Sequence, residues 1–594
     1  MADRTVLAAA GKTDFDLLIK DVRIVNVFND TVTEGCIGLA DGRIAYVGDY
    51  EEGMAASEII DGGHSYAVPG FVDSHMHLES SMLTPDHFAA RLLSLGTTTV
   101  CADPHEIANV SGKKGIEYLM EACRDLPLRL FMMAPSTIPS APGFEGSGYA
   151  VDQKEMEELL SMEGIYGLGE VMDFNGVGNC EEHILSVVET ARKTGCIMDG
   201  HVALLDGRRL QVFRASGIDS DHTVGTAEKL KEELALGFTV QGQLGKLNPE
   251  IVKAMNDAPV KARICLVTDD VPLNRLMKEG HLNHVVEKAI ELGLDPLYAI
   301  RFATINGAVR LRCYDIGAIA PGMQADIQLM DDIRHPMPRL VISGGRKIAE
   351  NGRIISKFPH LKVPSELYGT MHMETVAEED LIIRCPVKKG FRGGSALFNI
   401  IGEDGVSVAT RHIQKRLCLS EEKDGYALPD TEGLLRMAVF NRHGKKQHSL
   451  GLIEGMGTPK GAMAITYSHD AHNLSVFGGN ERDMAICTNA LIGSGGGLCA
   501  ARDGEILDLI PLPVSGLLSE EDPEELLIQI EKLLSDCRDM GFSHRDLSSF
   551  FTLMALAVSP RIKLSDMGLV DVAHKSFLPL YEDIREDHID NPTK

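Results

Sequence analysis

Short apolar runs recur along the middle of the chain, and each is followed by a stretch with helical spacing. Thr84-Pro85 and Asn248-Pro249 place a capping residue before a proline, which is typical of a helix start. Strands that alternate with helices predict a parallel sheet, and eight such units predict a closed (β/α)8 TIM barrel over residues 68–315. We interpret as its strands the runs at residues 71–75, 97–102, 129–134, 165–169, 196–200, 218–221, 238–242 and 263–268.

The segments on both sides of this region have a different pattern, in which polar and apolar residues alternate over short stretches, as in short strands. Turn signals such as Asp41-Gly42 separate these strands. We therefore expect residues 14–67 and 316–380 to pair into one small β-sandwich domain. The remaining C-terminal residues, 381–594, mix strand and helix patterns and predict an additional α+β domain. Residues 1–13 carry charges early and lack an apolar signal core, so we expect a disordered tail.

Composition narrows the class of protein. Of the 594 residues, 44% are hydrophobic and 24% are charged, which is typical of an ordinary globular protein. The net charge of −28 argues against a nucleic-acid or acidic-membrane surface. The 12 cysteines form no Cys-x-x-Cys pair, so they indicate neither a disulfide framework nor a zinc ribbon. Because there is also no apolar run of 18 residues, we expect a cytoplasmic enzyme with no nucleic-acid or membrane partner.

Ionisable residues follow six of the eight predicted strands. In a (β/α)8 barrel the carboxyl ends of all strands meet at one rim, where the chemistry takes place. Each residue alone has an ordinary alternative, such as a local hydrogen bond or a helix cap, but their coincidence on six strands favours a metal site. They are His75, His77, Asp103, His105, Glu106, Glu170, Asp199, His201, Asp219, Asp221, His222, Asp269 and Asp270.

The ligand types indicate which metals and which chemistry are expected. His75 and His77 are two residues apart, so both imidazoles lie on one face of their strand. Four histidines with two carboxylates suit zinc, iron or manganese better than calcium or magnesium. Six ligands exceed what one catalytic ion with an open position needs, so we expect two ions that share a carboxylate and acidify a common water. The predicted set is His75, His77, Glu170, His201, His222 and Asp269.

The motif Pro69-Gly-Phe-Val-Asp-Ser-His-Met-His77, with the later His201, His222 and Asp269, resembles the amidohydrolase superfamily. From about residue 15 to the end, the chain is more narrowly similar to the bacterial type of the adenine deaminase family. Asp199-Gly-His-Val-Ala and Asp221-His-Thr depart from the Asp-Gly-His-Ala-Pro and Asp-His-Glu of many relatives, without loss of a ligand. The stretches that carry the narrower likeness are His75-Met-His-Leu-Glu-Ser-Ser, Asp103-Pro-His-Glu-Ile-Ala-Asn-Val, Gly169-Glu-Val-Met-Asp, Thr268-Asp-Asp and Ser468-His-Asp-Ala-His-Asn473.

The resemblance implies hydrolytic deamination of adenine to hypoxanthine and ammonia, a step of purine salvage, by a metal-bridged hydroxide. It implies two divalent ions per chain, Mn²⁺ or Fe²⁺ ahead of Zn²⁺. Glu170 would be shared between an ion held by His75, His77 and Asp269 and an ion held by His201 and His222. Asp269 would move the proton from water to ammonia. For protonation of the ring the candidates are Glu106 and His105, which have the alternative role of orienting a metal histidine.

The sequence does not decide the role of the C-terminal loop or exclude other functions. The loop Ser468–Asn473 is consistent with a further metal site, with a segment that shapes the substrate pocket, or with a hydrogen-bonded turn between a strand and a helix. The alternatives to adenine deamination are an amidohydrolase reaction on a related aminated base or a cyclic amide, and a non-catalytic scaffold. We expect a small-molecule partner, adenine, and a homo-oligomer, either dimer or tetramer. Candidate pocket residues are Glu79, Ser80, His469, Asp470 and His472.

Overall fold

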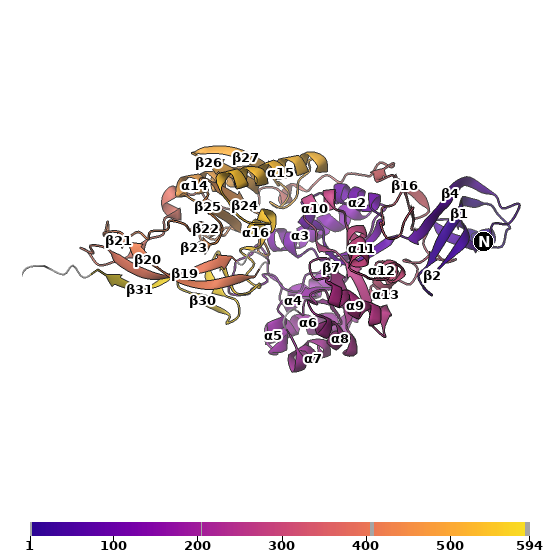
Figure 1. Ribbon diagram of the computed structural model, residues 1–594, viewed down its shortest axis with the longest axis horizontal. Helices are drawn as coiled ribbons and strands as arrows, with labels where there is room; N and C mark the ends of the chain where they lie inside the picture. Colours follow the sequence, from indigo (N-terminus) through magenta and orange to yellow (C-terminus); the bar gives the residue numbers. More distant parts are fainter. Residues whose placement is uncertain (1–2, 203–204, 404–408, 588–594) are drawn as a thin grey trace, which may run out of the picture. The chain divides into compact units, whose positions relative to one another are not determined.

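A computed structural model describes residues 3–202, 205–403 and 409–587 of the chain. The chain divides into two compact units. The first comprises Met1–Pro104, Ile116–Ser136 and Val151–Lys362. The second comprises His105–Gly115, Thr137–Ala150 and Val363–Lys594. In Figure 1 the first unit is mostly indigo and magenta, and the second is mostly orange and yellow.

Parallel strands form the centre of the first unit. They pair in a sheet of order β13-β5-β6-β7-β8-β9 and in a second sheet of order β10-β11-β12. Every residue of β5 and β6 is buried, as expected for parallel strands whose two faces are both covered. Strands β5 to β12 lie within a few residues of the eight predicted ones, and β13 is an additional short strand. The bounds are β5 Phe71–His77, β6 Thr97–Ala102, β7 Arg129–Ala134, β8 Ile165–Val171, β9 Ile197–Gly200, β10 Ser220–Asp221, β11 Thr239–Gln243, β12 Ile264–Val267 and β13 Asp269–Asp270.

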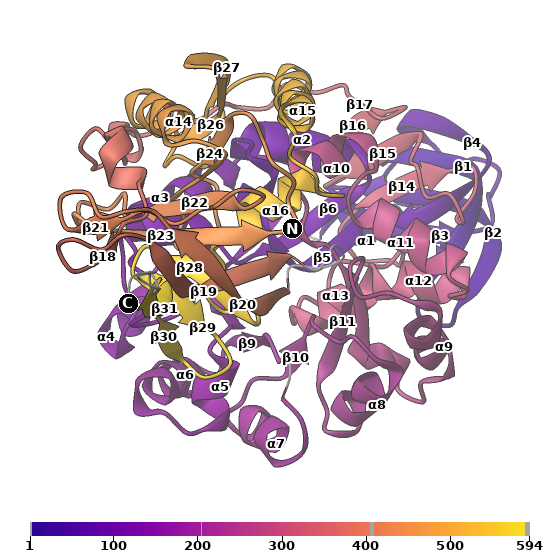
Figure 2. The same ribbon diagram turned by 60° about the vertical axis from the view of Figure 1, so that its left-hand side comes forward.

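Helices follow most of these strands, and Figure 2 shows α7, α8 and α9 along their outer side. Local capping explains where several begin. Asn248 accepts hydrogen bonds from two backbone N–H groups at the start of α9. Pro249 is the first residue of this helix, and because proline has no N–H, its nitrogen leaves no donor without an acceptor. The bounds are α2 Pro85–Ser94, α4 Gln153–Ser161, α5 Phe174–Gly178, α6 Glu182–Thr194, α7 Gly207–Ala215, α8 Ala227–Ala235, α9 Pro249–Asp257, α10 Leu273–Lys278, α11 Leu282–Glu291, α12 Pro296–Phe302 and α13 Ile305–Arg310. Helix α3, His105–Cys123, is kinked at Gly112, which has a positive φ of 57°.

The first unit also contains a mixed sheet built from two stretches that are far apart in the sequence. Its order is β17-β16-β15-β14-β4-β1-β2-β3. The two stretches meet where β14 pairs antiparallel with β4, with Ile327 opposite Pro69. Because β5 follows Pro69 almost directly, this sheet anchors the strand that carries His75 and His77. The bounds are β1 Phe15–Asn26, β2 Thr31–Ala40, β3 Arg43–Gly48, β4 Ala56–Pro69, β14 Ile327–Met330, β15 Leu340–Ser343, β16 Arg346–Glu350 and β17 Arg353–Ile354.

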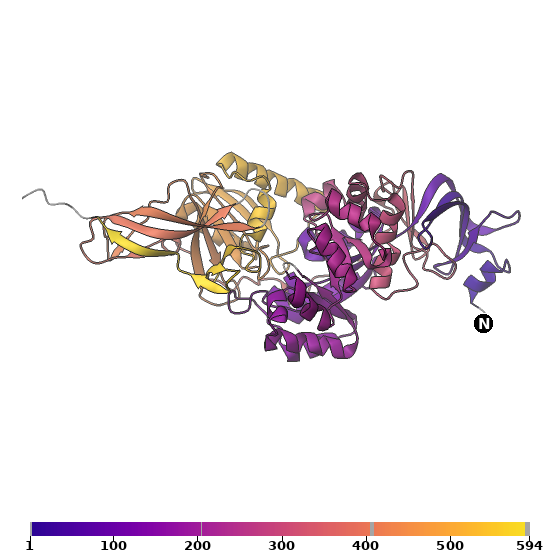
Figure 3. The ribbon, with the colours of Figure 1, turned by 60° about the horizontal axis from the view of Figure 1, so that its bottom comes forward.

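The N-terminal segment differs from the disordered tail that the sequence predicted. Helix α1, Arg4–Ala9, packs beside the indigo strands (Figure 3). Asp3 caps it by accepting from the Thr5 N–H, and Arg4 forms salt bridges with Asp16 and Asp41 at 2.6 and 3.0 Å. The early charges of this segment therefore attach it to the neighbouring sheet.

The second unit contains a large mixed sheet, in the order β20-β19-β23-β22-β25-β24-β26-β27 with β31 beside β19. Helix α14 packs on β24, β25 and β26 through apolar side chains that include Met484 and Leu491. The bounds are β18 Cys385–Pro386, β19 Gly394–Glu403, β20 Thr410–Leu419, β21 Tyr426–Ala427, β22 Leu435–Phe440, β23 His448–Glu454, β24 Ala462–Ile465, β25 Leu474–Gly478, β26 Gly497–Arg502, β27 Glu505–Pro511, β28 Ile562–Ser565, β29 Gly568–Asp571, β30 Ser576–Leu578, β31 Tyr581–Glu586, α14 Glu481–Ser494, α15 Pro523–Met540 and α16 Leu547–Leu553.

One sequence-based expectation can be compared with this unit directly. The loop Ser468–Asn473 connects strands β24 and β25, so it is not a turn between a strand and a helix. In the part of the chain that the structure describes, no helix has both the length and the apolar character needed to cross a membrane.

A buried histidine of the first unit makes its stability depend on pH. The His281 side chain contacts Thr97 and Thr268, and burial lowers its pKa to about 3, from 6.5. Below pH 6.5 the unfolded chain therefore takes up a proton that the folded chain does not, and the free energy of unfolding falls as pH falls. From pH 7 to pH 5, this histidine should account for a loss of about 2 kcal/mol.

We predict that His281→Gln removes most of this pH-dependent difference. The check is urea unfolding of the metal-free protein, followed by circular dichroism at pH 7 and pH 5. The exposed His64 of the same unit provides the control variant His64→Gln, which should keep the wild-type pH dependence. An unchanged dependence in His281→Gln would contradict the assignment.

Candidate metal centre

The end of β5 places two imidazoles next to each other. His75 and His77 are both buried, and their ring centroids are 5.1 Å apart. The sequence predicted this proximity, because residues i and i+2 of a strand point to the same face. His222, which follows β10, stacks on His75 with a centroid distance of 3.9 Å.

Glu170, near the end of β8, lies among three of the histidines. Its Oε1 atom is 3.3 Å from His77 Nε2. Its Oε2 atom is 2.7 Å from His201 Nδ1 and 3.3 Å from His222 Nε2. Because the two oxygens of one carboxylate face different histidines, Glu170 has the arrangement expected of a carboxylate shared by two ions.

Asp269 completes the group from the short strand β13. This strand pairs with β5, with Asp269 opposite Met76, and so brings the carboxylate next to both β5 histidines. Asp269 Oδ1 is 3.3 Å from His77 Nε2 and 3.7 Å from His75 Nε2. Gln243, at the end of β11, donates a hydrogen bond to Asp269 Oδ2.

The histidines keep both carboxylates ionised. Burial by itself would raise the pKa of Glu170, but His222, His201 and His77 together hold that pKa well below its usual range. The same opposition acts on Asp269, where His222, His75 and His77 outweigh burial and lower the pKa. Ionised carboxylates beside imidazole nitrogens are the state in which these side chains bind cations.

Two groups outside this set orient the histidines, and a third holds the backbone of Glu170. His75 Nδ1 is 2.8 Å from Asp199 Oδ2, and His77 Nδ1 is 3.0 Å from the carbonyl oxygen of Asp103. We infer that each Nδ1 carries the hydrogen, because its partner only accepts, so each Nε2 lone pair points to the centre. The Asp103 side chain accepts from the Glu170 N–H at 2.8 Å, which fixes the β8 backbone.

The sequence identifies Asp199 only as a polar residue at a strand end. Its link to His75 joins β9 to β5, strands that are not neighbours in the sheet, so no spacing in the sequence indicates it. Arg310 stabilises the carboxylate further, with Nη2 3.6 Å from Asp199 Oδ1. The only sequence feature that pointed to a role for Asp199 is its position two residues before His201 at the same strand end.

The donor set fits divalent transition-metal ions. The side-chain donors fall into overlapping groups of three, His75–His77–Glu170, His75–His222–Asp269 and Glu170–His201–His222, with all atoms of a group within 4.8 Å of one another. Among the described residues, the buried His75 Nε2 has no hydrogen-bond partner, as expected for an atom whose partner is an ion. Nitrogen and carboxylate donors together suit zinc, iron or manganese.

Two candidate pocket residues directly follow β5. Glu79 and Ser80 lie in the short 3-10 helix η1, Leu78–Ser81, and both are buried. The Ser80 hydroxyl donates to the Asp270 carboxylate, which links this turn to β13. Their role toward a substrate stays a prediction.

The other predicted residues belong to the second unit, which brings them together. His105 and Glu106 begin α3, and His469, Asp470 and His472 lie in the β24–β25 loop. His105 Nε2 is 3.8 Å from Glu106 Oε1, and His469 Nδ1 is 4.0 Å from the same oxygen. The expectation that Glu106 or His105 protonates a substrate ring stays a prediction.

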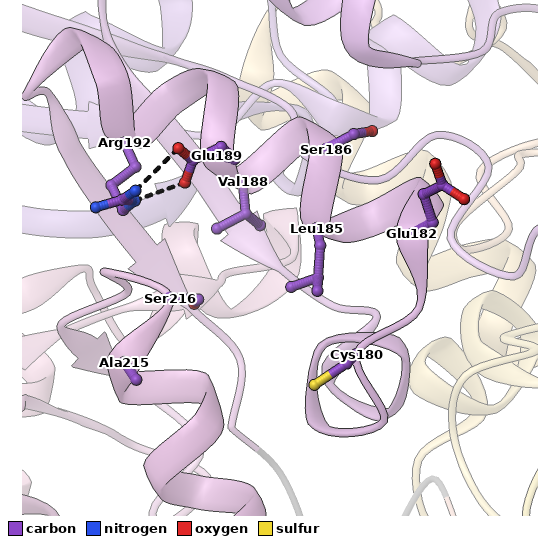
Figure 4. Close-up of a pocket in the computed structure, with 9 residues that line it drawn as sticks. All are labelled: Cys180, Glu182, Leu185, Ser186, Val188, Glu189, Arg192, Ala215 and Ser216. Carbon is purple, nitrogen blue, oxygen red and sulfur yellow. Dashed lines mark hydrogen bonds and ion pairs between the residues drawn. The ribbon is translucent and has the colours of Figure 1, made fainter.

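A surface hollow of about 710 Å³ contains none of the predicted site residues. Figure 4 shows it beside α6, with Leu185 and Val188 on one side and Ala215 and Ser216 on another. Its charged groups include Glu189 and Arg192, which pair with each other at 2.7 Å. We assign no chemistry to this hollow.

Comparison with known proteins agrees with this geometry. The chain matches the amidohydrolase family model over residues 66–371 and the model of the adenine deaminase C-terminal domain over residues 407–576. An adenine deaminase of Kosmotoga olearia is 34% identical over 579 residues, which is 96% of this chain and 98% of that protein. Those of Halalkalibacterium halodurans and Bacillus velezensis are each 36% identical, over 97% of both chains and over 96% and 98%, respectively.

The chain belongs to the adenine deaminases of the amidohydrolase family. The parallel strands described above therefore have the fold of the amidohydrolase family. The strand ends that carry the polar side chains lie within residues 66–371, which match the family model. The match to the C-terminal domain model covers the β24–β25 loop. The resemblance inferred from the sequence motifs is confirmed.

We predict that Asp199→Asn weakens metal binding by this family member about 10- to 100-fold, because the neutral amide no longer holds the His75 tautomer as strongly. Competition with a fluorescent chelator would measure the dissociation constants. The control is Asp219→Asn, since Asp219 pairs with Arg310 at 3.3 Å and does not contact a histidine of the centre in the structure. Equal affinities of Asp199→Asn and the wild type would refute the orienting role.

Proposed function

We propose that this protein is a metal-dependent hydrolase that converts adenine and water to hypoxanthine and ammonia. One observation carries the proposal: Glu170 faces three histidines from both of its oxygens, in a chain that aligns along nearly its full length with adenine deaminases. Its proposed role is in purine salvage in the cytoplasm, as a homo-oligomer.

The proposed framework is a closed (β/α)8 barrel. Strand β9 lies next to β10, and β12 lies next to β5, which supports closure of the two parallel sheets into one barrel. The proposed domains are the barrel at 68–315, the flanking β domain at 14–67 plus 316–380 and the C-terminal domain at 381–594. In a barrel of this kind, the strand ends that carry His75, Glu170 and Asp269 share one face.

The proposed cofactor is a pair of divalent ions, Mn²⁺ or Fe²⁺ with Zn²⁺ as the alternative. His75, His77 and Asp269 would hold one ion, His201 and His222 the other, and Glu170 would contribute one oxygen to each. Two such ions lower the pKa of water and so make a nucleophile available near neutral pH. The His201 side chain is 30% exposed, which leaves this side of the centre accessible to a substrate.

The protein side chains supply binding and proton transfer. Asp269 has one oxygen toward the histidines and the other bonded to Gln243, so its carboxylate is held in a fixed orientation. We assign to Asp269 the transfer of a proton from water to the departing amino group of C6. Gln243 would thereby act as a positioning residue for Asp269.

The direct test is adenine consumption with stoichiometric release of ammonia, on protein loaded separately with manganese, iron and zinc. We expect turnover of adenine but not of guanine, cytosine or adenosine. Turnover of a different aminated base or a cyclic amide would replace adenine as the substrate and keep the hydrolytic centre. Absence of any turnover, with two ions bound per chain, would refute the proposed reaction.

Substitution of Asp269 tests its role in proton transfer. We predict that Asp269→Asn lowers kcat about 100- to 10,000-fold, because the amide cannot take up the proton. Metal analysis should still find bound metal, since Glu170 and the histidines remain. Asp270→Asn is the matched control at the neighbouring position, and we expect its kcat to stay within about threefold of the wild type. A near-normal rate for Asp269→Asn would remove this residue from the mechanism.

A further inference from the structure

A buried carboxyl group of β5 holds the segment that carries Asp269. Asp73 lies in the middle of this strand and is fully buried. Its Oδ2 atom accepts a hydrogen bond of 2.6 Å from the Thr268 hydroxyl, and its Oδ1 atom accepts one of 3.3 Å from the Thr268 N–H. Thr268 directly precedes Asp269. A single side chain of β5 therefore fixes the residue next to the proposed ligand.

The same carboxyl group is also bonded to the backbone of a histidine in the centre. The His75 N–H donates to Asp73 Oδ1 at 3.4 Å. One oxygen of Asp73 thus accepts from the backbone of His75 and from the backbone of Thr268. Because both donors share this acceptor, Asp73 ties the position of the segment before Asp269 to the position of the β5 histidines.

The backbone of Asp269 needs such support. Its φ of 61° lies in the left-handed region, which is unfavourable for a residue with a Cβ atom. Residues keep this conformation where the surrounding structure enforces it. The pairing of β13 with β5 covers only two residues, Asp269 and Asp270. The hydrogen bonds to Thr268 add a second restraint, directly before the residue with the unfavourable φ.

The Thr268 hydroxyl is itself oriented by a chain of buried side chains. His281 Nε2 is 3.3 Å from Thr268 Oγ1, and His281 Nδ1 is 3.3 Å from Thr97 Oγ1. A hydroxyl has one hydrogen, and here it points to the closer acceptor, Asp73 Oδ2. His281 Nε2 then carries a hydrogen and donates it to Thr268, while Nδ1 accepts from Thr97. This chain keeps the hydroxyl hydrogen directed at Asp73.

We propose that Asp73 is a positioning residue that acts through Thr268 to hold the Asp269 carboxylate against His77. The inference deepens the proposed function, on which it rests for the role of Asp269 in proton transfer. Asp269 Oδ1 is 3.3 Å from His77 Nε2. A displacement of a reacting group by about 1 Å can lower a rate about 100-fold, so the hydrogen bonds to Thr268 affect the reaction without contact with the substrate.

The test compares two substitutions of Thr268 in the full-length protein. Thr268→Val removes the hydroxyl and keeps the shape of the side chain, whereas Thr268→Ser keeps the hydroxyl. In crystals of the metal-free protein, we expect Thr268→Val to move the Asp269 carboxylate about 1 Å away from His77. Thr268→Ser should leave this carboxylate in place.

Kinetics of the manganese-loaded protein provide the second measurement. Thr268→Val should lower kcat for adenine about 10- to 100-fold and leave KM within about threefold of the wild type, because substrate binding does not depend on Asp269. Thr268→Ser should restore kcat. The matched control is Thr190→Val, a change of a buried threonine in α6 whose hydroxyl donates to the Ser186 carbonyl at 2.9 Å. It should retain the wild-type kcat and KM.

An Asp269 carboxylate that stays in place in Thr268→Val would overturn the proposal, and so would an equal loss of kcat in Thr268→Ser. If the wild type does not turn over adenine, the proposed function fails, while the crystals still decide whether Thr268 positions Asp269.

If circular dichroism shows that Thr268→Val does not fold, Asp73→Asn replaces it. An amide has one acceptor oxygen for the donors that two carboxyl oxygens serve in the wild type. A displaced Asp269 carboxylate in Asp73→Asn would support the positioning role, and an unmoved one would refute it.

Discussion

The arrangement of the first unit depends on one buried carboxylate. Glu170 is almost fully removed from water, and burial of an ionised carboxylate is unfavourable unless opposite charges or hydrogen-bond donors surround it. His77, His201 and His222 supply these partners from three other strand ends. Any change that separates the strand ends therefore leaves a buried charge without compensation.

The parallel sheet meets this requirement because the carboxyl ends of its strands lie on one side. β5 contributes two histidines, and β8 contributes the shared carboxylate. Backbone contacts then fix the side chains: the Asp103 carboxylate accepts from the Glu170 N–H, and the Asp103 carbonyl accepts from His77. A single residue after β6 thus positions ligands on both of the other strands.

Much of this architecture could be predicted from the sequence. Period-two spacing places His75 and His77 on one face, and uninterrupted apolar runs locate the eight strands from β5 to β12. The two-residue strand β13 could not be recognised, since two acidic residues carry no strand pattern and their pairing with β5 is a tertiary contact. The same holds for the bond between Asp199 and His75, which joins strands that are distant in the sheet.

The positions of His105 and Glu106 could not be predicted from the sequence for the same reason. The sequence places His105 and Glu106 directly after the barrel strand β6, because sequence order is the only information it gives about their position. The compact unit to which they belong also includes the β24–β25 loop, and this grouping depends on contacts between segments hundreds of residues apart. Helix α1 is a similar case, since two long-range salt bridges of Arg4 hold a short helix that would be unstable alone.

The most direct test of the central claim is anomalous diffraction from crystals of the manganese-loaded protein. The account predicts two manganese peaks next to Glu170, one on the side of His77 and one on the side of His201 and His222. A single peak there, or two peaks that do not share the Glu170 carboxylate, would contradict it.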